Sequence, residues 1–266
     1  MTNLTPDLTG FAGEPGTPHR YGYRVSHRTH PRTPAAAATA GVGERIGDQV
    51  RETLQDVKPR LRGWLHAGTA PLALAAGVVL VALSPNAWTR VGSAVFATSA
   101  LVLFTVSAVY HRGTWGPRAL RLLRRFDHAN IFLLIAGSYT PFTLLLLHGT
   151  DRVVLLTTVW TGAALGVLFR VFWNDAPRWL YTPIYLALGW AAVFYFGDFV
   201  DHASTAVLVL IAVGGGLYTL GGLVYGFRRP NPSPRWFGFH EVFHTLTVAA
   251  FASHYAGVSL ATYSLR

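Results

Sequence analysis

Long apolar runs separated by short polar segments fill the chain from about residue 67 onward. Each run reaches or approaches the roughly 20 residues that a helix needs to cross the hydrocarbon of a bilayer. We predict membrane-spanning helices at 67–84, 87–110, 128–147, 153–173, 180–196, 203–227 and 239–262. The pattern predicts an all-α integral membrane protein, a bundle of seven transmembrane helices within residues 67–266.

The part of the chain before these runs has a different character. Residues 1–43 are rich in Thr, Pro, Gly, Ala and Arg and contain no apolar segment that could offset the entropy of ordering. We predict a disordered tail there. In residues 44–66 apolar side chains first recur at helical spacing among charges, which predicts an amphipathic helix on the membrane surface, followed by a short lead-in.

Basic residues predict the orientation of the bundle. Most of them lie in or beside the segments on one predicted side of the membrane, namely before the first span and after the second, fourth and sixth spans. They are Lys58, Arg60, Arg62, Arg112, Arg118, Arg121, Arg124, Arg125, Arg170, Arg178, Arg228, Arg229 and Arg235. The alternate segments carry Arg90, Arg152 and Arg266 with three aspartates. Because Lys and Arg collect on the cytoplasmic side, we predict a cytoplasmic N-terminus and a C-terminus outside.

Composition narrows the function classes. Only 13% of the residues are charged, against about 25% in soluble domains. The net charge of +10 does not indicate a nucleic-acid-binding protein. The arginines lie between apolar runs, whereas nucleic-acid binding requires a basic patch on a soluble surface. Cysteine is absent, which excludes disulfides, thiolate zinc sites and iron–sulfur clusters. A metal ion would have to be bound by imidazole, carboxylate or water.

The predicted topology brings three histidines to one depth. His111 ends the second span, and His240 and His244 begin the seventh, all on the cytoplasmic side. The spacing of four residues places His240 and His244 on one helical face, within reach of one ion. Three protein nitrogens with an open fourth position are typical of a catalytic zinc site. Each histidine alone can instead be a polar tip at headgroup level.

Two further residues are candidates for a catalytic role. Asp127 starts the third predicted span on the same side and could hold or deprotonate a metal-bound water; the alternative is a helix N-cap. Ser107 lies one turn deeper than His111 on the same face, where its hydroxyl could orient the imidazole or the water. His128 should point elsewhere. His254 lies about 15 Å beyond His244, too far to share the ion.

Residues 240–244 also read HEVFH, which fits the HExxH pattern of metalloproteases. In that interpretation Glu241 is the general base. The alternative is an acidic residue in the first helical turn, where it stabilises the helix dipole. No further protease-like ligand motif accompanies the pattern, which favours the second interpretation.

The ordered set of motifs resembles the hemolysin III proteins, the bacterial branch of the progestin and adiponectin receptor superfamily. The matching residues are 107–111 (SAVYH), Asp127, 135–141 (IAGSYTP), 240–244 (HEVFH), His254, Tyr255 and Gly257. The resemblance implies a seven-helix bundle with an intramembrane Zn²⁺ near the cytoplasmic face. In that family the counterparts of Ser107, His111, Asp127, His240 and His244 form the site, and eukaryotic relatives often have Gln at the position of Glu241.

Three functions follow from the residues and the resemblance. We favour a zinc-dependent hydrolase in the plasma membrane, acting on a membrane lipid amide such as ceramide, or on an ester. A pore-forming, cytolytic protein is the second, although the first, fourth and fifth spans are almost wholly apolar. The third is a receptor-like sensor with structural zinc, whose basic loops contact anionic headgroups. The oligomeric state stays open.

Overall fold

The computed structural model describes residues 59–173 and 175–265, where regular structure is helical apart from one bridge between Ser233 and Phe237. The elements are α2 (Trp64–Ala82), α3 (Ala87–Arg112), α4 (Pro117–Leu146), α5 (Gly149–Phe172), α6 (Arg178–Gly189), the 3₁₀-helix η1 (Ala191–Tyr195), α7 (Phe196–His202), α8 (Thr205–Phe227) and α9 (Phe239–Tyr263). The predicted tail at 1–43, and the segment 44–58 that contains the predicted amphipathic helix, lie outside the described residues.

Within the described ranges, six helical segments are long and apolar enough to cross a membrane. They are α2, α3, α4, α5, α8 and the stretch Arg178–His202, which combines α6, η1 and α7. Helix α9 adds 25 residues that pack along α8. The described part of the chain is a helical membrane bundle, as predicted. The number of seven spans and the sides of the two termini stay predictions.

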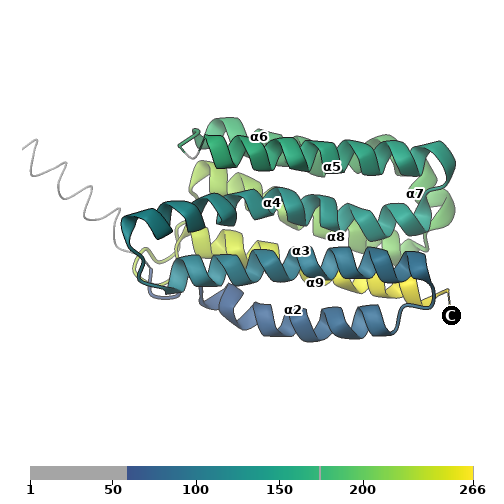
Figure 1. Ribbon diagram of the computed structural model, residues 1–266, viewed down its shortest axis with the longest axis horizontal. Helices are drawn as coiled ribbons and strands as arrows, with labels where there is room; N and C mark the ends of the chain where they lie inside the picture. The colour runs from purple at the N-terminus through teal and green to yellow at the C-terminus, as the bar shows by residue number, and fades with distance from the viewer. Residues whose placement is uncertain (1–58, 174, 266) are drawn as a thin grey trace, which may run out of the picture. The chain divides into compact units, whose positions relative to one another are not determined.

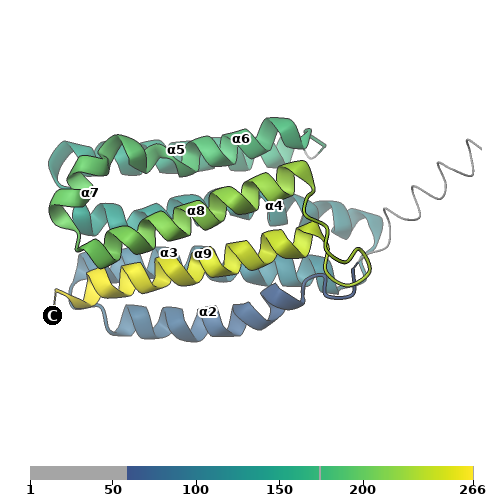
Figure 2. The same ribbon diagram turned by 180° about the vertical axis from the view of Figure 1, so that it is seen from behind.

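The long helices lie side by side along one direction (Figure 1). Helices α3 and α4 form one face of the bundle, and α8 and α9 form the opposite face (Figure 2). Helix α2 packs against α3 and α9, while α5 packs against α4, and α6 against α8. The end of α3 and the starts of α4 and α9 therefore meet at one end of the bundle.

Side-chain caps fix where two of these helices begin. The Asn86 carboxamide accepts from the Thr89 N–H at 3.0 Å, and the Thr89 hydroxyl accepts from the Asn86 N–H at 3.2 Å, a capping box at the start of α3. At the start of α9, Glu241 accepts from the Gly238 N–H at 2.8 Å. Each cap supplies partners for N–H groups that the first helical turn leaves unpaired.

Helix α4 begins at Pro117, well before the predicted third span at 128–147. Hydropathy excludes the arginine-rich stretch 118–125, but arginine is a good helix former and proline suits the first helical position. The helix therefore continues beyond the apolar run. Because Gly116 is the N-cap, Asp127 lies nearly three turns inside the helix. The alternative that Asp127 caps this helix is wrong.

The fifth predicted span, 180–196, is not a continuous α-helix. Helix α6 ends at Gly189 and gives way to η1 and α7. Tyr139 of α4 compensates for the break, because its hydroxyl donates to the Gly189 carbonyl at 2.6 Å and accepts from the Ala192 N–H at 2.9 Å. Irregular backbone at membrane depth requires such internal partners.

Candidate metal centre

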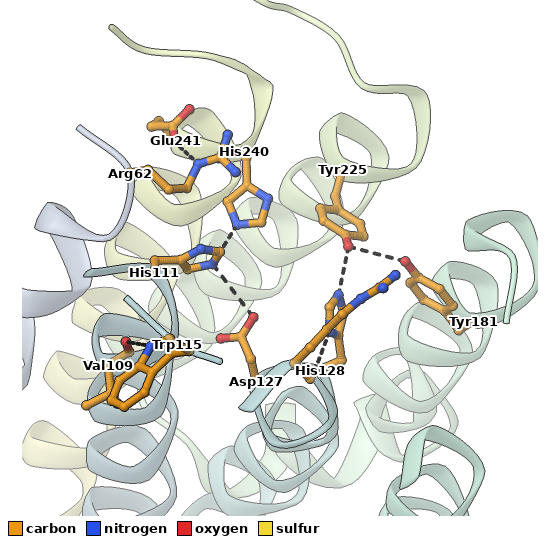
Figure 3. A network of polar contacts seen from close by, with 11 residues as sticks. Arg62, Val109, His111, Trp115, Asp127, His128, Tyr181, Tyr225, His240 and Glu241 are labelled. Atoms are coloured by element: carbon orange, nitrogen blue, oxygen red, sulfur yellow. Dashed lines mark hydrogen bonds and ion pairs between the residues drawn. The ribbon is translucent and has the colours of Figure 1, made fainter. Parts of the chain in front are cut away.

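Three buried histidines meet at the end of the bundle where α3 ends and α9 begins. Two of them, His111 and His240, are drawn in Figure 3. His111, His240 and His244 each offer one ring nitrogen, and the three nitrogens lie within 4.8 Å of one another. His111 Nε2 and His240 Nε2 are 3.1 Å apart. The spacing of one helical turn places the His240 and His244 rings on one face of α9, with centroids 4.4 Å apart.

The shortest of these distances fits a shared metal ion. Two nitrogens at tetrahedral positions on Zn²⁺, each about 2.0–2.1 Å from the ion, are about 3.3 Å apart. The 3.1 Å between His111 Nε2 and His240 Nε2 is close to that value, and it also fits one imidazole N–H donating to the other ring. A set of three imidazoles suits several first-row transition metals. The geometry supports a metal site without selecting the metal.

Asp127 and Ser107 lie beside the histidines. Asp127 Oδ2 is 3.8 Å from His111 Nε2, too long for a direct hydrogen bond but suited to a bridging water. The buried Ser107 hydroxyl faces the Asp127 carboxyl, yet it completes no hydrogen bond among the described residues. Both side chains thus have unused hydrogen-bonding capacity next to the three nitrogens, where a water molecule would be held.

His66 is a member of this cluster that sequence reasoning missed. It lies in the first turn of α2, is 2% exposed, and neither of its ring nitrogens has a hydrogen-bond partner among the described residues. Its ring stacks on His244 and meets the edge of Phe104 at 5.1 Å between centroids. The only signal in the sequence was a single histidine at the start of an apolar helix.

Glu241 lies in the same turn of α9 but has a different set of contacts. Arg62 Nε donates to Glu241 Oε1, forming an ion pair (Figure 3). The Gly238 N–H donates to Glu241 Oε2. The carboxylate is 1% exposed. Glu241 therefore joins the start of α9 to the segment that precedes α2, which supports the structural interpretation of HEVFH over the protease-like one.

His128 points away from the three-histidine cluster, as predicted. Its Nε2 lies 3.0 Å from the Tyr225 hydroxyl, which in turn lies 3.2 Å from the Tyr181 hydroxyl (Figure 3). His128 Nδ1 contacts the Arg124 carbonyl at 2.7 Å. This chain of contacts forms a second polar cluster between α4, α6 and α8, and it occupies both nitrogens of His128.

A cavity of about 170 Å³ extends from the centre into the bundle. His66, Ser107, Asp127 and His244 line one part of it, and most of the remaining wall is apolar, contributed mainly by α4, α6, α8 and α9. The wall includes the break at Gly189 and reaches His254, the histidine predicted to be too distant to share the ion. The polar centre thus opens into a largely apolar space.

A helical membrane bundle with a buried histidine cluster defines the class of this protein. The sequence profile of the family described as "Haemolysin-III related" matches residues 54–255. The chain belongs to that family, which confirms the resemblance seen in its motifs.

Individual relatives agree with this assignment. The chain is 33% identical over 172 residues to "Hemolysin-3 homolog" of Bacillus subtilis (strain 168), an alignment covering 63% of this chain and 80% of that protein. It is 29% identical over 167 residues to "Hemolysin-3" of Bacillus cereus, covering 62% and 76%. It is 30% identical over 161 residues to "Adiponectin receptor protein" of Drosophila melanogaster, covering 52% and 35%. The Drosophila match extends the similarity from the Bacillus proteins to an adiponectin receptor protein.

Proposed function

We propose that this haemolysin III protein is a zinc-dependent hydrolase of a membrane lipid amide or ester. The observation that carries the proposal is the cluster of His111, His240 and His244, with ligand nitrogens within 4.8 Å of one another. It lies beside the Asp127 carboxyl and the Ser107 hydroxyl, at one end of a largely apolar cavity, and this hydroxyl has no hydrogen-bond partner among the described residues. Such a cavity suits an acyl chain better than a soluble substrate.

When bound, Zn²⁺ would polarise a substrate carbonyl and allow a bound water to ionise near neutral pH. Asp127 Oδ2 accepts the proton of the attacking water, and the Ser107 hydroxyl orients that water. The water oxygen bonds to the carbonyl carbon, the carbon–nitrogen or carbon–oxygen bond breaks, and the leaving amine or alcohol takes the proton held by Asp127. The products are a fatty acid and the amine or alcohol that forms the rest of the lipid.

We further propose seven spans in the plasma membrane, with α9 as the last and with the histidine end of the bundle facing the cytoplasm. Arg112 and Arg118 flank the loop from α3 to α4, and Arg228 and Arg235 lie in the loop from α8 to α9. These loops lie at the histidine end (Figure 1). The bias of basic residues toward the cytoplasm then places the centre at inner-leaflet depth.

Metal analysis of the purified chain tests the site. We expect about one Zn²⁺ per chain in the wild type, and loss of most of the metal in His111→Ala and in His240→Ala. His202→Ala is the matched control, because His202 lies on α7 and is exposed. A wild-type protein purified without stoichiometric zinc contradicts the site.

An assay of fatty-acid release tests the proposed hydrolysis. Purified protein is incubated with defined ceramides and N-acyl amides, and the released fatty acid is quantified by mass spectrometry. Removing a general base typically costs 10²–10⁴-fold in rate, so Asp127→Asn should fall by at least about 100-fold. Activity that survives in both Asp127→Asn and His244→Ala would show that this centre does not catalyse the reaction.

The names of the Bacillus relatives favour a lytic protein as a second candidate. A pore needs a water-filled path lined by polar groups. The cavity in the described part of the chain is largely apolar, which supports the hydrolase instead. Dye leakage from liposomes, compared between wild type and His244→Ala, distinguishes the two: leakage that needs no substrate turnover favours lysis.

A further inference from the structure

Two polar groups lie in the cavity wall away from the three-histidine cluster. Tyr218 of α8 and His254 of α9 both line the cavity, and their ring centroids are 5.5 Å apart. His254 is 8% exposed, and neither its Nδ1 nor the Tyr218 hydroxyl has a hydrogen-bond partner among the described residues. A buried polar group without a partner loses the free energy of its hydration, so two together indicate a place for a polar ligand group.

The position of the His254 ring is set by α8. A Cβ atom added to Gly214 would lie 2.2 Å from His254 Cδ2, so this glycine lets the imidazole pack against the α8 backbone. His254 Nε2 is 3.4 Å from the Ile211 carbonyl, and Phe142 meets the ring edge-on at 5.6 Å between centroids. The tautomer that donates from Nε2 to Ile211 leaves Nδ1 as a hydrogen-bond acceptor.

The hydrogen-bonding capacity of His254 and Tyr218 determines which polar ligand group can pair with both. His254 Nδ1 accepts, whereas the Tyr218 hydroxyl can donate. Ser138 Oγ lies near that hydroxyl, and its own hydrogen is donated to the Leu134 carbonyl. A ligand hydroxyl can donate to Nδ1 and accept from Tyr218 at once. A carbonyl would leave Nδ1 unpaired, and a carboxylate would bring negative charge against its lone pair.

The distance to the metal centre sets where the hydroxyl lies on the ligand. His254 is ten residues beyond His244 on α9, about 15 Å along the helix axis. Leu134, Ile135 and Phe142 contribute apolar wall to the same cavity. We propose that Tyr218 and His254 bind a hydroxyl group carried within the lipid chain, about 15 Å from the group at the histidine cluster. This inference rests on the proposed lipid-binding function and names its substrate class, a hydroxylated acyl chain.

The test compares two probes on the purified full chain: stearic acid and the same acid with a mid-chain hydroxyl. Each displaces a fluorescent fatty acid. We expect the wild type to bind the hydroxylated chain about tenfold more tightly, which corresponds to about 1.4 kcal/mol. Tyr218→Phe and His254→Phe should each reduce the preference to less than threefold while binding of stearic acid stays within twofold of wild type.

Tyr255→Phe is the matched control. It also removes a tyrosine hydroxyl, but that hydroxyl donates to the Ala76 carbonyl at 3.0 Å and Tyr255 does not line the cavity, so the preference should persist. Equal binding of the two acids by the wild type, as expected if ordered water occupies the pair, overturns this inference and leaves the proposed function standing. A preference that persists in both Tyr218→Phe and His254→Phe also overturns it. Failure of both acids to bind contradicts the lipid-binding function as well.

Discussion

The imidazole rings of His66 and His244 stack face to face, with centroids 3.8 Å apart and planes inclined by 13°. Helix α2 therefore contacts a proposed metal ligand without supplying a ligand of its own. Ligating histidines are usually held in orientation by outer contacts, whose loss typically weakens metal affinity 10–100-fold. We infer that His66 restrains the His244 ring by stacking, since neither nitrogen of His66 has a hydrogen-bond partner among the described residues.

We accordingly predict that His66→Ala weakens metal affinity about tenfold, because His244 loses the ring that restrains it. His66→Phe keeps an aromatic ring in the same place and should stay within about threefold of wild type. Competition with a chromogenic zinc chelator measures both. If His66→Phe loses as much affinity as His66→Ala, the imidazole nitrogens matter and stacking is not the cause.

Glu241→Gln should retain metal and turnover. The amide oxygen can still accept from the Gly238 N–H, while the ion pair with Arg62 is lost. Glu241→Ala removes both contacts and leaves the Arg62 guanidinium without this partner, so we expect it to destabilise the fold by about 3 kcal/mol. Thermal unfolding, zinc content and fatty-acid release are measured together. A loss of turnover of 100-fold or more in Glu241→Gln at full zinc content would support the metalloprotease-like interpretation, in which Glu241 is the general base.

Tyr139→Phe tests the break between α6 and α7. Removing the hydroxyl leaves the Gly189 carbonyl and the Ala192 N–H without that partner, and each such loss costs about 1–3 kcal/mol. We expect a lower melting temperature and faster hydrogen exchange at residues 189–195. Tyr255→Phe, which removes one bond to the Ala76 carbonyl, is the control and should leave exchange at 189–195 unchanged. Unaltered exchange in Tyr139→Phe would mean that the break is held by other contacts.

The proposed orientation can be tested by cysteine labelling, because the chain has no cysteine of its own. Asp201→Cys lies on α7, remote from the histidine end, and should react with a membrane-impermeant maleimide on intact cells. Arg235→Cys, in the loop before α9, should react only after lysis. Labelling of both on intact cells would contradict the orientation, and the reverse pattern would invert it.

The sequence predicted most helices because crossing a membrane requires long apolar runs, and it predicted one face for His240 and His244 from their spacing. Placing His111 at the same depth as these two histidines required only the predicted order and direction of the spans. The start of α4 was missed because hydropathy does not report helix that extends past the apolar run. The break near Gly189 depends on Tyr139, which is 50 residues away, and the role of His66 depends on how α2 and α9 pack. Such tertiary contacts leave no local pattern.

The ion pair between Arg62 and Glu241 has a consequence for biosynthesis. Arg62 leaves the ribosome before every transmembrane helix, whereas Glu241 emerges at the start of α9, 179 residues later. His240 and His244 emerge in the same turn as Glu241. A nascent chain therefore holds His111 alone until its final helix is made. The Arg62–Glu241 contact and the last two nitrogens of the cluster therefore become available together, so the proposed three-histidine metal site cannot be complete before α9 is synthesised.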